Sequence, residues 1–241
     1  MIGAVYGILA LLGLWQMIVS LLDLPFFILP SPIRVAETFW LSFELIAEHT
    51  LVTLTEVVIG LGIGTGLGVL TAILLATSSA AQVFLRPMLI FSQALPVFAL
   101  APILTLWLGY GLWSKVAMAV LIIYFPITSS FFDGLMRTPK GLLDLAYTMG
   151  ASSLNTMLKI RIPAALPSFV SGLKLATVYA PIGATIGEWV GSSGGLGYLM
   201  LLANGRVKID LMFAAMLTLG VISVILYIVV DFLSKKMINY E

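Results

Sequence analysis

The side chains of this 241-residue chain offer few groups for catalysis. It contains no cysteine and a single histidine, His49. Thiolate chemistry, cysteine-ligated metals and the paired histidines of an HExxH zinc site are therefore excluded, and no catalytic or metal-binding residue is expected. The phosphate-binding pattern GxxxxGK is also missing, because the run Gly111-Leu112-Trp113-Ser114-Lys115 lacks the second glycine. If ATP drives this protein, another chain must hydrolyse it.

One short run could supply a nucleophile. Gly191-Ser192-Ser193-Gly194 matches the GxSG pattern of rhomboid intramembrane serine proteases. Their mechanism needs a histidine base within hydrogen-bond reach of the serine. In rhomboids this base comes from a later helix, whereas His49 precedes the serine. The run is therefore interpreted as a flexible glycine- and serine-rich turn.

Ionisable residues inside apolar stretches are candidates for a transport pathway, because an uncompensated charge at the bilayer centre costs at least about 2.5–3.5 kcal/mol. Glu188 is predicted either to face a gate or substrate, or to accept backbone N–H bonds from the glycine-rich turn 191–197. Glu56 is expected at the interface in contact with water, and Lys174 is expected to extend to the cytoplasmic interface. The pathway and gate candidates are Gln93, Tyr124, Tyr179, Glu188 and Trp189.

The composition places these residues in a membrane protein. Hydrophobic residues make up 61% of the chain and charged residues 10%, and the mean hydropathy is +1.13. Soluble domains have about 45–50% apolar and about 25% charged residues. The net charge of +1 and the scattered basic residues exclude a nucleic-acid-binding face.

Stretches without charge predict an all-α membrane protein with about six transmembrane helices, because a span needs about 20 apolar residues. The predicted spans are 1–22, 57–85, 87–114, 116–132, 164–190 and 211–230. The first has no basic start and no cleavage site, so we expect a retained helix. The chain is thus divided into an N-terminal helix (1–22), an outer loop (23–50) and a five-helix core (51–241) with a cytoplasmic loop at 134–163.

Small residues and prolines mark the interiors of several spans. Gly60, Gly64 and Gly68 share one helical face, which predicts close helix packing, with a substrate-facing stripe as the alternative. Pro96 and Pro181 predict broken spans of the kind that transporters use for their pathways. An ion-coupled secondary transporter is therefore an alternative class. No inverted repeat is evident, however, and such a transporter would leave the long cytoplasmic loop without a partner.

The distribution of lysine and arginine over the short loops predicts that both termini are cytoplasmic. The inner residues are Arg86, Arg137, Lys140, Lys159, Arg161, Lys235 and Lys236, and the outer ones are Arg34, Lys115, Arg206 and Lys208. Seven against four favours this orientation.

The cytoplasmic loop has the pattern of two short helices. Thr138 and Pro139 predict a helix start, and Gly150 predicts its end. The apolar face of this helix consists of Leu142, Leu145, Ala146 and Met149. Ser152 or the serine after it is expected to cap a second helix that ends before Pro163. An apolar face this short cannot cross a bilayer, so it must be buried against lipid headgroups or another protein.

This loop also contains Asp144-Leu145-Ala146, three residues, Gly150, nine residues and then Ile160-Arg161-Ile162-Pro163. The spacing resembles the EAA motif of permease subunits of binding-protein-dependent ABC importers, which reads Glu-Ala-Ala, three residues, Gly, nine residues, Ile-x-Leu-Pro. Asp144, Leu145 and Ile162 depart from that pattern. The resemblance implies that the residues coupling the permease to an ATPase are Asp144, Leu145, Ala146, Met149, Gly150, Ile160 and Pro163.

Other segments are similar to the sulfonate, taurine, nitrate and thiamine-precursor branch of these permeases. They include Leu29-Pro30-Ser31-Pro32, Gly187-Glu188-Trp189-Val190-Gly191 and Gly195-Leu196-Gly197-Tyr198. The run Gln93-Ala94-Leu95-Pro96-Val97-Phe98 resembles the hydroxymethylpyrimidine members in particular.

The resemblance implies a type I ABC importer permease with the MetI-like fold in the cytoplasmic membrane, itself not an enzyme. The implied partners are a second copy of this chain, two ATPase subunits, an extracytoplasmic binding protein and membrane lipid, but no nucleic acid. ATP and magnesium would bind the ATPase, so no cofactor is expected on this chain. The first choice of substrate is hydroxymethylpyrimidine or another thiamine precursor, with a sulfonate, taurine, nitrate or riboflavin as alternatives.

Overall fold

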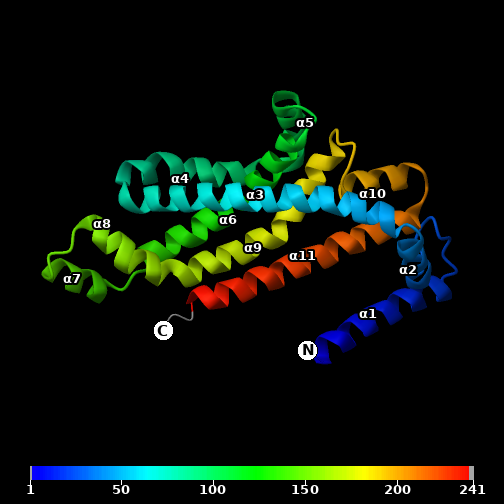
Figure 1. Ribbon diagram of the computed structural model, residues 1–241, viewed down its shortest axis with the longest axis horizontal. Helices are drawn as coiled ribbons and strands as arrows, with labels where there is room; N and C mark the ends of the chain where they lie inside the picture. Colours follow the sequence, from blue (N-terminus) through cyan, green and yellow to red (C-terminus); the bar gives the residue numbers. More distant parts are fainter. Residues whose placement is uncertain (1, 239–241) are drawn as a thin grey trace.

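The structure, a computed structural model, describes residues 2–238, which form helices and no strand (Figure 1). In chain order the elements are α1 (Ile2–Leu21), α2 (Pro32–Leu41), α3 (Phe43–Thr77), α4 (Ser79–Ala94), α5 (Val97–Leu108), α6 (Leu112–Met136), α7 (Lys140–Thr148), α8 (Ser153–Thr156), the π-helical turn η1 (Met157–Arg161), α9 (Ile162–Trp189), α10 (Leu196–Gly205) and α11 (Ile209–Ile238). The all-α prediction is confirmed. Helices satisfy their own backbone hydrogen bonds, as a lipid environment requires.

Several helices have the length and composition of membrane spans. Four segments are each long and apolar enough to cross a membrane, namely α3, α6, the continuous segment Ser153–Trp189, and α11 within Ile209–Lys236. α4 and α5 are long and apolar enough only when taken together as a pair, which is bent by 103° at the break between the two helices. α1 has 20 residues, which is the length of a span. The four segments and the bent pair correspond to five of the six predicted spans, although several boundaries differ, and α1 lies at the position of the first, 1–22.

The predicted second span, 57–85, is wrong at both ends. α3 begins at Phe43, inside the segment 23–50 that was expected to be an outer loop and that also contains α2. A search for uncharged stretches finds only the hydrocarbon part of a helix, whereas α3 extends beyond that part through Glu44 and Glu48. α3 ends at Thr77 because Ser78 is extended, and its side-chain oxygen accepts the N–H of Ala81 to begin α4.

The predicted third span, 87–114, is interrupted rather than continuous. Leu95 is extended, with φ −79° and ψ 126°, because the ring of Pro96 disfavours a helical residue before it. Gly109, with φ +82°, then ends α5. α6 begins at Leu112, so Lys115 lies in its first turns and not in the expected outer loop.

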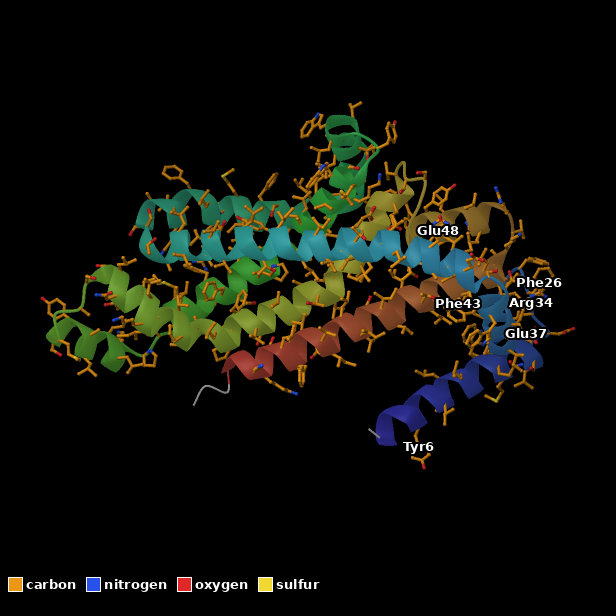
Figure 2. All side chains as sticks on the ribbon, viewed as in Figure 1. Tyr6, Phe26, Arg34, Glu37, Phe43 and Glu48 are labelled. Atoms are coloured by element: carbon orange, nitrogen blue, oxygen red, sulfur yellow. The ribbon has the colours of Figure 1, made fainter. Side chains whose placement is uncertain are left out.

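The long helices run along the longest dimension of the molecule, so two ends can be distinguished (Figure 1). One end carries α7 and α8, and the opposite end carries α2 and α10. Charged residues such as Arg34, Glu37 and Glu48 lie at the α2 end (Figure 2). α1 runs toward the α2 end, and α11 runs away from it.

Glycines let α3, α6 and α9 approach closely, and these contacts form the centre of the fold. A Cβ atom at Gly64 of α3 would lie 2.7 Å from Ile123 Cδ1 of α6, and one at Gly183 of α9 would lie 2.6 Å from Ala119 Cα. Small residues at helix contacts are typical of membrane bundles. The predicted packing role of Gly60, Gly64 and Gly68 is confirmed, because all three are buried against α6.

Replacing Gly64 with isoleucine is expected to destabilise the subunit by about 1–3 kcal/mol, because the new side chain overpacks the contact between α3 and α6. Gly66→Ile is the matched control on the same helix, since a Cβ atom there meets nothing within 4 Å. Thermal unfolding of both variants in detergent checks the difference. Equal midpoints would contradict the packing role of Gly64.

Candidate functional site

The first candidate site is the connection between α6 and α9, at the end of the molecule remote from α2 (Figure 1). α7 ends as predicted, because Gly150 has φ +72° and the N–H of Ala151 donates to the carbonyl of Ala146 at 2.9 Å. This is a Schellman-type helix end, which requires a left-handed residue. Thr138 does not cap α7, contrary to the prediction. Its hydroxyl donates instead to the carbonyl of Leu135 at 3.0 Å, at the end of α6.

The second helix of this connection continues directly into the membrane. Ser152 caps it as predicted, with its side-chain oxygen accepting the N–H of Asn155 at 3.3 Å. The prediction that it ends before Pro163 is wrong, because the π-helical turn Met157–Arg161 joins α8 to α9. A proline ring clashes with the carbonyl one turn earlier in a regular helix, and the wider turn relieves this clash. The result is one continuous helical segment, Ser153–Trp189.

The apolar face of α7 is exposed in the subunit. Leu142, Leu145 and Met149 have exposed fractions of 44%, 56% and 77%, whereas Ala146 is buried. Ala146 is therefore covered, and the three larger side chains face outward. Of the other motif residues, Asp144, Gly150 and Pro163 are exposed and Ile160 is half-buried. A group of exposed apolar side chains on a short helix is typical of a surface that contacts protein or membrane.

The second candidate site is a polar cluster buried where α3, α6 and α9 meet the turn before α10. Glu188 is 0% exposed. Its carboxylate accepts the hydroxyl of Thr53 at 2.6 Å and the backbone N–H of Gly197. A Cβ atom at Gly195 would lie 2.2 Å from the Glu188 carboxyl carbon, and one at Gly197 would lie 2.7 Å from its Oε2. The glycines thus let the backbone close around the carboxylate, which is the structural alternative predicted for Glu188.

Two further charged residues belong to this cluster, and the predictions for both are wrong. Lys115 is 1% exposed rather than part of an outer loop. Its ammonium group donates to the carbonyl oxygens of Tyr110, Gly111 and Gly191. Glu56 is 2% exposed rather than in contact with water, and its carboxyl group lies beside that of Glu188. One ammonium and two carboxyl groups therefore share this buried site.

The remaining pathway candidates are not part of the buried cluster. The hydroxyl of Tyr124 donates to that of Thr71 at 2.7 Å, which joins α6 to α3. Gln93 is exposed on α4, and Tyr179 and Trp189 are 40% and 43% exposed on α9. These three side chains can therefore be reached from outside the single subunit.

Lys174 forms an ion pair that the sequence did not predict. Its ammonium group contacts Asp231 of α11, whose other carboxylate oxygen lies 2.8 Å from Lys235 Nζ. Asp231 lies in the last turns of α11 (Ile209–Ile238), and this end of α11 points away from α2 (Figure 1). The pair links α9 to α11 and compensates the charge of Lys174.

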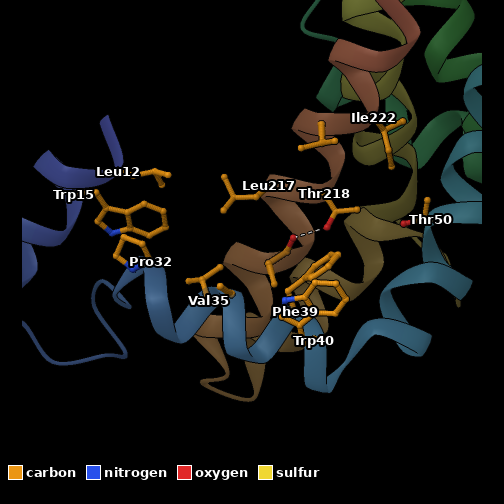
Figure 3. A pocket seen from close by; sticks show the side chains of 13 residues that line it. Leu12, Trp15, Pro32, Val35, Phe39, Trp40, Thr50, Leu217, Thr218 and Ile222 are labelled. Atoms are coloured by element: carbon orange, nitrogen blue, oxygen red, sulfur yellow. Dashed lines mark hydrogen bonds between the residues drawn. The ribbon is translucent and has the colours of Figure 1, made fainter. Parts of the chain in front are cut away.

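An apolar cavity of about 430 Å³ lies between α1, α2 and α11 (Figure 3). Trp15 of α1, Phe39 of α2 and Leu217 of α11 line it. The hydroxyl of Thr218 is occupied within its own helix, where it donates to the carbonyl of Ala214 at 2.7 Å. The lining has no charged residue and is mostly apolar, although Trp15 Nε1 and Thr50 Oγ1 are buried there without a hydrogen-bond partner among the described residues.

The run 191–194 forms a turn, as predicted. The hydroxyl of Ser192 donates to the carbonyl of Gly194 at 2.7 Å. His49 does reach this region, but its Nδ1 accepts the backbone N–H of Gly195 at 3.0 Å. This hydrogen bond joins the turn to α3. Among the described residues, His49 therefore does not form the histidine–serine pair that a serine protease needs.

The structure thus combines several helices that are long and apolar enough to span a membrane with a short helix that exposes an apolar face at one end, as in a multi-pass membrane subunit. Residues 64–239 match the family described as the binding-protein-dependent transport system inner membrane component. The chain belongs to this family. It is a multi-pass inner-membrane permease of an ABC importer and not an enzyme, because ATP is hydrolysed by a separate subunit. Its partners therefore include an ATPase and a substrate-binding protein.

Three relatives illustrate the range of similar sequences. A probable ABC transporter permease protein of Haemophilus influenzae is 52% identical over 95% of this chain and 93% of its own length. The formylaminopyrimidine transport permease protein ThiX of Halalkalibacterium halodurans is 41% identical over 79% of this chain and 76% of its own. The riboflavin transport system permease protein RibX of Chloroflexus aurantiacus is 36% identical over 100% of this chain and 90% of its own.

Two solved structures have the same fold. The MetNI methionine ABC transporter in an inward-facing conformation matches with a TM-score of 0.61 at 21% identity, over 84% of this chain and 97% of that one. An amino acid ABC transporter with histidines matches with a TM-score of 0.66 at 14% identity, over 85% and 97%. The predicted MetI-like fold is confirmed.

Sequence reasoning missed part of the buried cluster. The hydroxyl of Thr53 donates to Glu188 and accepts the N–H of Leu196 at 2.7 Å, but a threonine in an apolar helix carries no distinctive pattern. Lys115 was interpreted as a loop residue because it ends an uncharged stretch. The sequence signal that could have indicated this cluster is the pair Gly195 and Gly197, because glycines at this spacing let the backbone approach a side chain closely.

Gly150→Val is expected to reduce ATP-driven uptake while the subunit stays in the membrane, because a β-branched residue disfavours positive φ by about 1–2 kcal/mol and would displace the end of α7. Gly150→Asn is the matched control, since asparagine tolerates the left-handed conformation. Uptake and ATP hydrolysis are measured with the complete importer in proteoliposomes. Equal uptake by the two variants would show that the helix end is not needed for coupling.

Proposed function

We propose that this permease imports a small pyrimidine of the thiamine-precursor class, with hydroxymethylpyrimidine or formylaminopyrimidine as the first choice. The observation that carries the proposal is the 41% identity to the formylaminopyrimidine permease. The riboflavin permease is 36% identical, an aliphatic sulfonate permease of Bacillus subtilis 28% and the taurine permease of Escherichia coli 23%. Similarity thus decreases from the pyrimidine to the sulfonate members.

The exposed face of α7 is the proposed docking surface for the ATPase. Leu142, Leu145 and Met149 would enter a groove on that subunit, in the manner of other helix-in-groove contacts. ATP and magnesium bind there and not on this chain. Two copies of this permease, each with one ATPase, form the complete importer.

The geometry of the connection supports a lever-like transmission of movement. The π-helical turn joins α8 to α9 without a break, so a displacement of α8 moves α9 with it, and α7 is linked to α8 by the short turn that begins at Gly150. α9 packs closely on α6 through Gly172 and Gly183. Closure of the ATPases would then rock this helix pair and shift the permease between inward-open and outward-open states.

Charge supports the orientation in which both termini and α7 are cytoplasmic. Because Lys115 is buried, the number of lysine and arginine residues assigned to the outer loops falls from four to three, against seven in the inner loops. α1 runs toward the α2 end and α11 runs back from it, as this orientation requires (Figure 1). The buried cluster then lies toward the extracytoplasmic side.

The translocation path is proposed to follow the exposed faces of α4 and α9. Gln93, Tyr179 and Trp189 are accessible there and combine flat apolar surface with polar groups, which suits a pyrimidine ring. Tyr124 and Glu188 take supporting roles behind this surface, because their polar atoms are already bonded to α3.

Deletion of the gene is expected to abolish energy-dependent uptake of labelled hydroxymethylpyrimidine, and expression of the wild-type permease in the deletion strain is expected to restore it. Unlabelled formylaminopyrimidine should compete, whereas riboflavin and taurine should not. Loss of riboflavin or sulfonate uptake instead, with pyrimidine uptake unchanged, would overturn the substrate proposal and leave the importer class intact.

Changing Leu142, Leu145 and Met149 together to serine is expected to remove the ATPase from the purified permease, because the docking face loses its apolar side chains. Mass spectrometry of the proteins that co-purify in mild detergent checks this. Tyr147→Ser is the control, since Tyr147 is 85% exposed on the opposite side of α7. Recovery of the ATPase with the triple variant would contradict the docking proposal.

A further inference from the structure

The buried cluster of Glu56, Lys115 and Glu188 holds more negative than positive ionisable groups. Their exposed fractions are 2%, 1% and 0%, so none is solvated from the single subunit. If every group were charged, the site would contain one buried net negative charge. Ions moved from water into a low-dielectric interior without a partner cost several kcal/mol each.

Lys115 is held in its charged form by its surroundings. Its ammonium group donates to three carbonyl oxygens, those of Tyr110 and Gly111 in the turn between α5 and α6 and that of Gly191. Three acceptors match the three donors of an ammonium group. Both carboxyl groups are electrostatic neighbours of Lys115, so one negative charge balances it.

Glu188 has the surroundings of an ionised carboxylate. Oε1 accepts the Thr53 hydroxyl at 2.6 Å, and Oε2 accepts the N–H of Gly197. The N–H of Tyr198 also faces this carboxylate. Donors converge on both oxygens, so the negative charge of the cluster belongs on Glu188.

Glu56 has the opposite surroundings. Its Oε2 is buried and has no hydrogen-bond partner among the residues that the structure describes. Its carboxyl group lies beside that of Glu188, and two adjacent carboxylates do not both ionise in such a site. His49, the other titratable group at this turn, is directed at Gly195 and not at Glu56.

We propose that Glu56 and Glu188 form a proton-binding site, in which one proton is held on Glu56 and shared with the Glu188 carboxylate. The cluster is then neutral with Lys115, and it fastens the turn before α10 to α3, α6 and α9. The inference depends on the burial and contacts of these groups and not on the identity of the transported solute.

The first test compares isosteric variants. Glu56→Gln reproduces a neutral Glu56 and is expected to unfold at the same temperature as the wild type in detergent. Glu188→Gln removes the charge that balances Lys115 and is expected to lower the midpoint clearly. Glu44→Gln, on an exposed position of α3, is the control for loss of a carboxylate. A Glu56→Gln midpoint as low as that of Glu188→Gln would overturn the proposal.

The second test observes the proton directly. At mildly alkaline pH exposed carboxyl groups are ionised, so infrared spectroscopy of the detergent-solubilised wild type should show the carbonyl band of a protonated carboxylic acid. The band should shift on exchange into heavy water and disappear in Glu56→Gln but not in Glu44→Gln. A missing band in the wild type, or a band that persists in Glu56→Gln, would overturn the proposal. A sodium-dependent rise of the midpoint that Glu56→Gln abolishes would also overturn it, because the occupant would be a metal cation.

Discussion

The hydrocarbon interior of a bilayer offers no hydrogen bonds, and the whole fold follows from that constraint. Regular helices satisfy this constraint on their own, and three of the interruptions between the helices of this chain are important for its sites. The break before Pro96 leaves α4 and α5 as a bent pair. The turn after Trp189 is bonded by the side chains of the buried cluster. The connection of α6 to α9 interrupts the bundle at the end remote from α2, where α7 can expose an apolar face.

The same two helices join the two candidate sites. α6 begins near Lys115 and ends just before α7, and α9 begins after α8 and ends at the residue following Glu188. Close contacts at Gly172, Gly183 and Gly187 hold this pair together along its length. A closely packed pair moves as a unit, because interiors at this density do not deform continuously. The connection that carries the exposed face of α7 and the buried cluster therefore lie at opposite ends of this helix pair.

The parts of this architecture that follow from local chemistry could be predicted. The helix end at Gly150, the span that became α11 and the packing face of Gly60, Gly64 and Gly68 each depend on residues near one another in the chain. The buried positions of Lys115 and Glu56 could not be predicted, because their compensating groups come from distant helices. Pro163 ends a regular helix but not one that contains a π-helical turn, and no sequence pattern indicates such a turn.

ATP-driven movement is proposed to enter this permease through the exposed apolar face of α7. The chain has no cysteine, so Leu145→Cys introduces a single thiol at that face. A thiol-reactive crosslinker should join this variant to the ATPase in the assembled importer, with a yield that changes when ATP is added. Trp107→Cys, 75% exposed on α5 and far from α7, should give no such product. Failure of Leu145→Cys to crosslink, or an equal product from Trp107→Cys, would contradict the account.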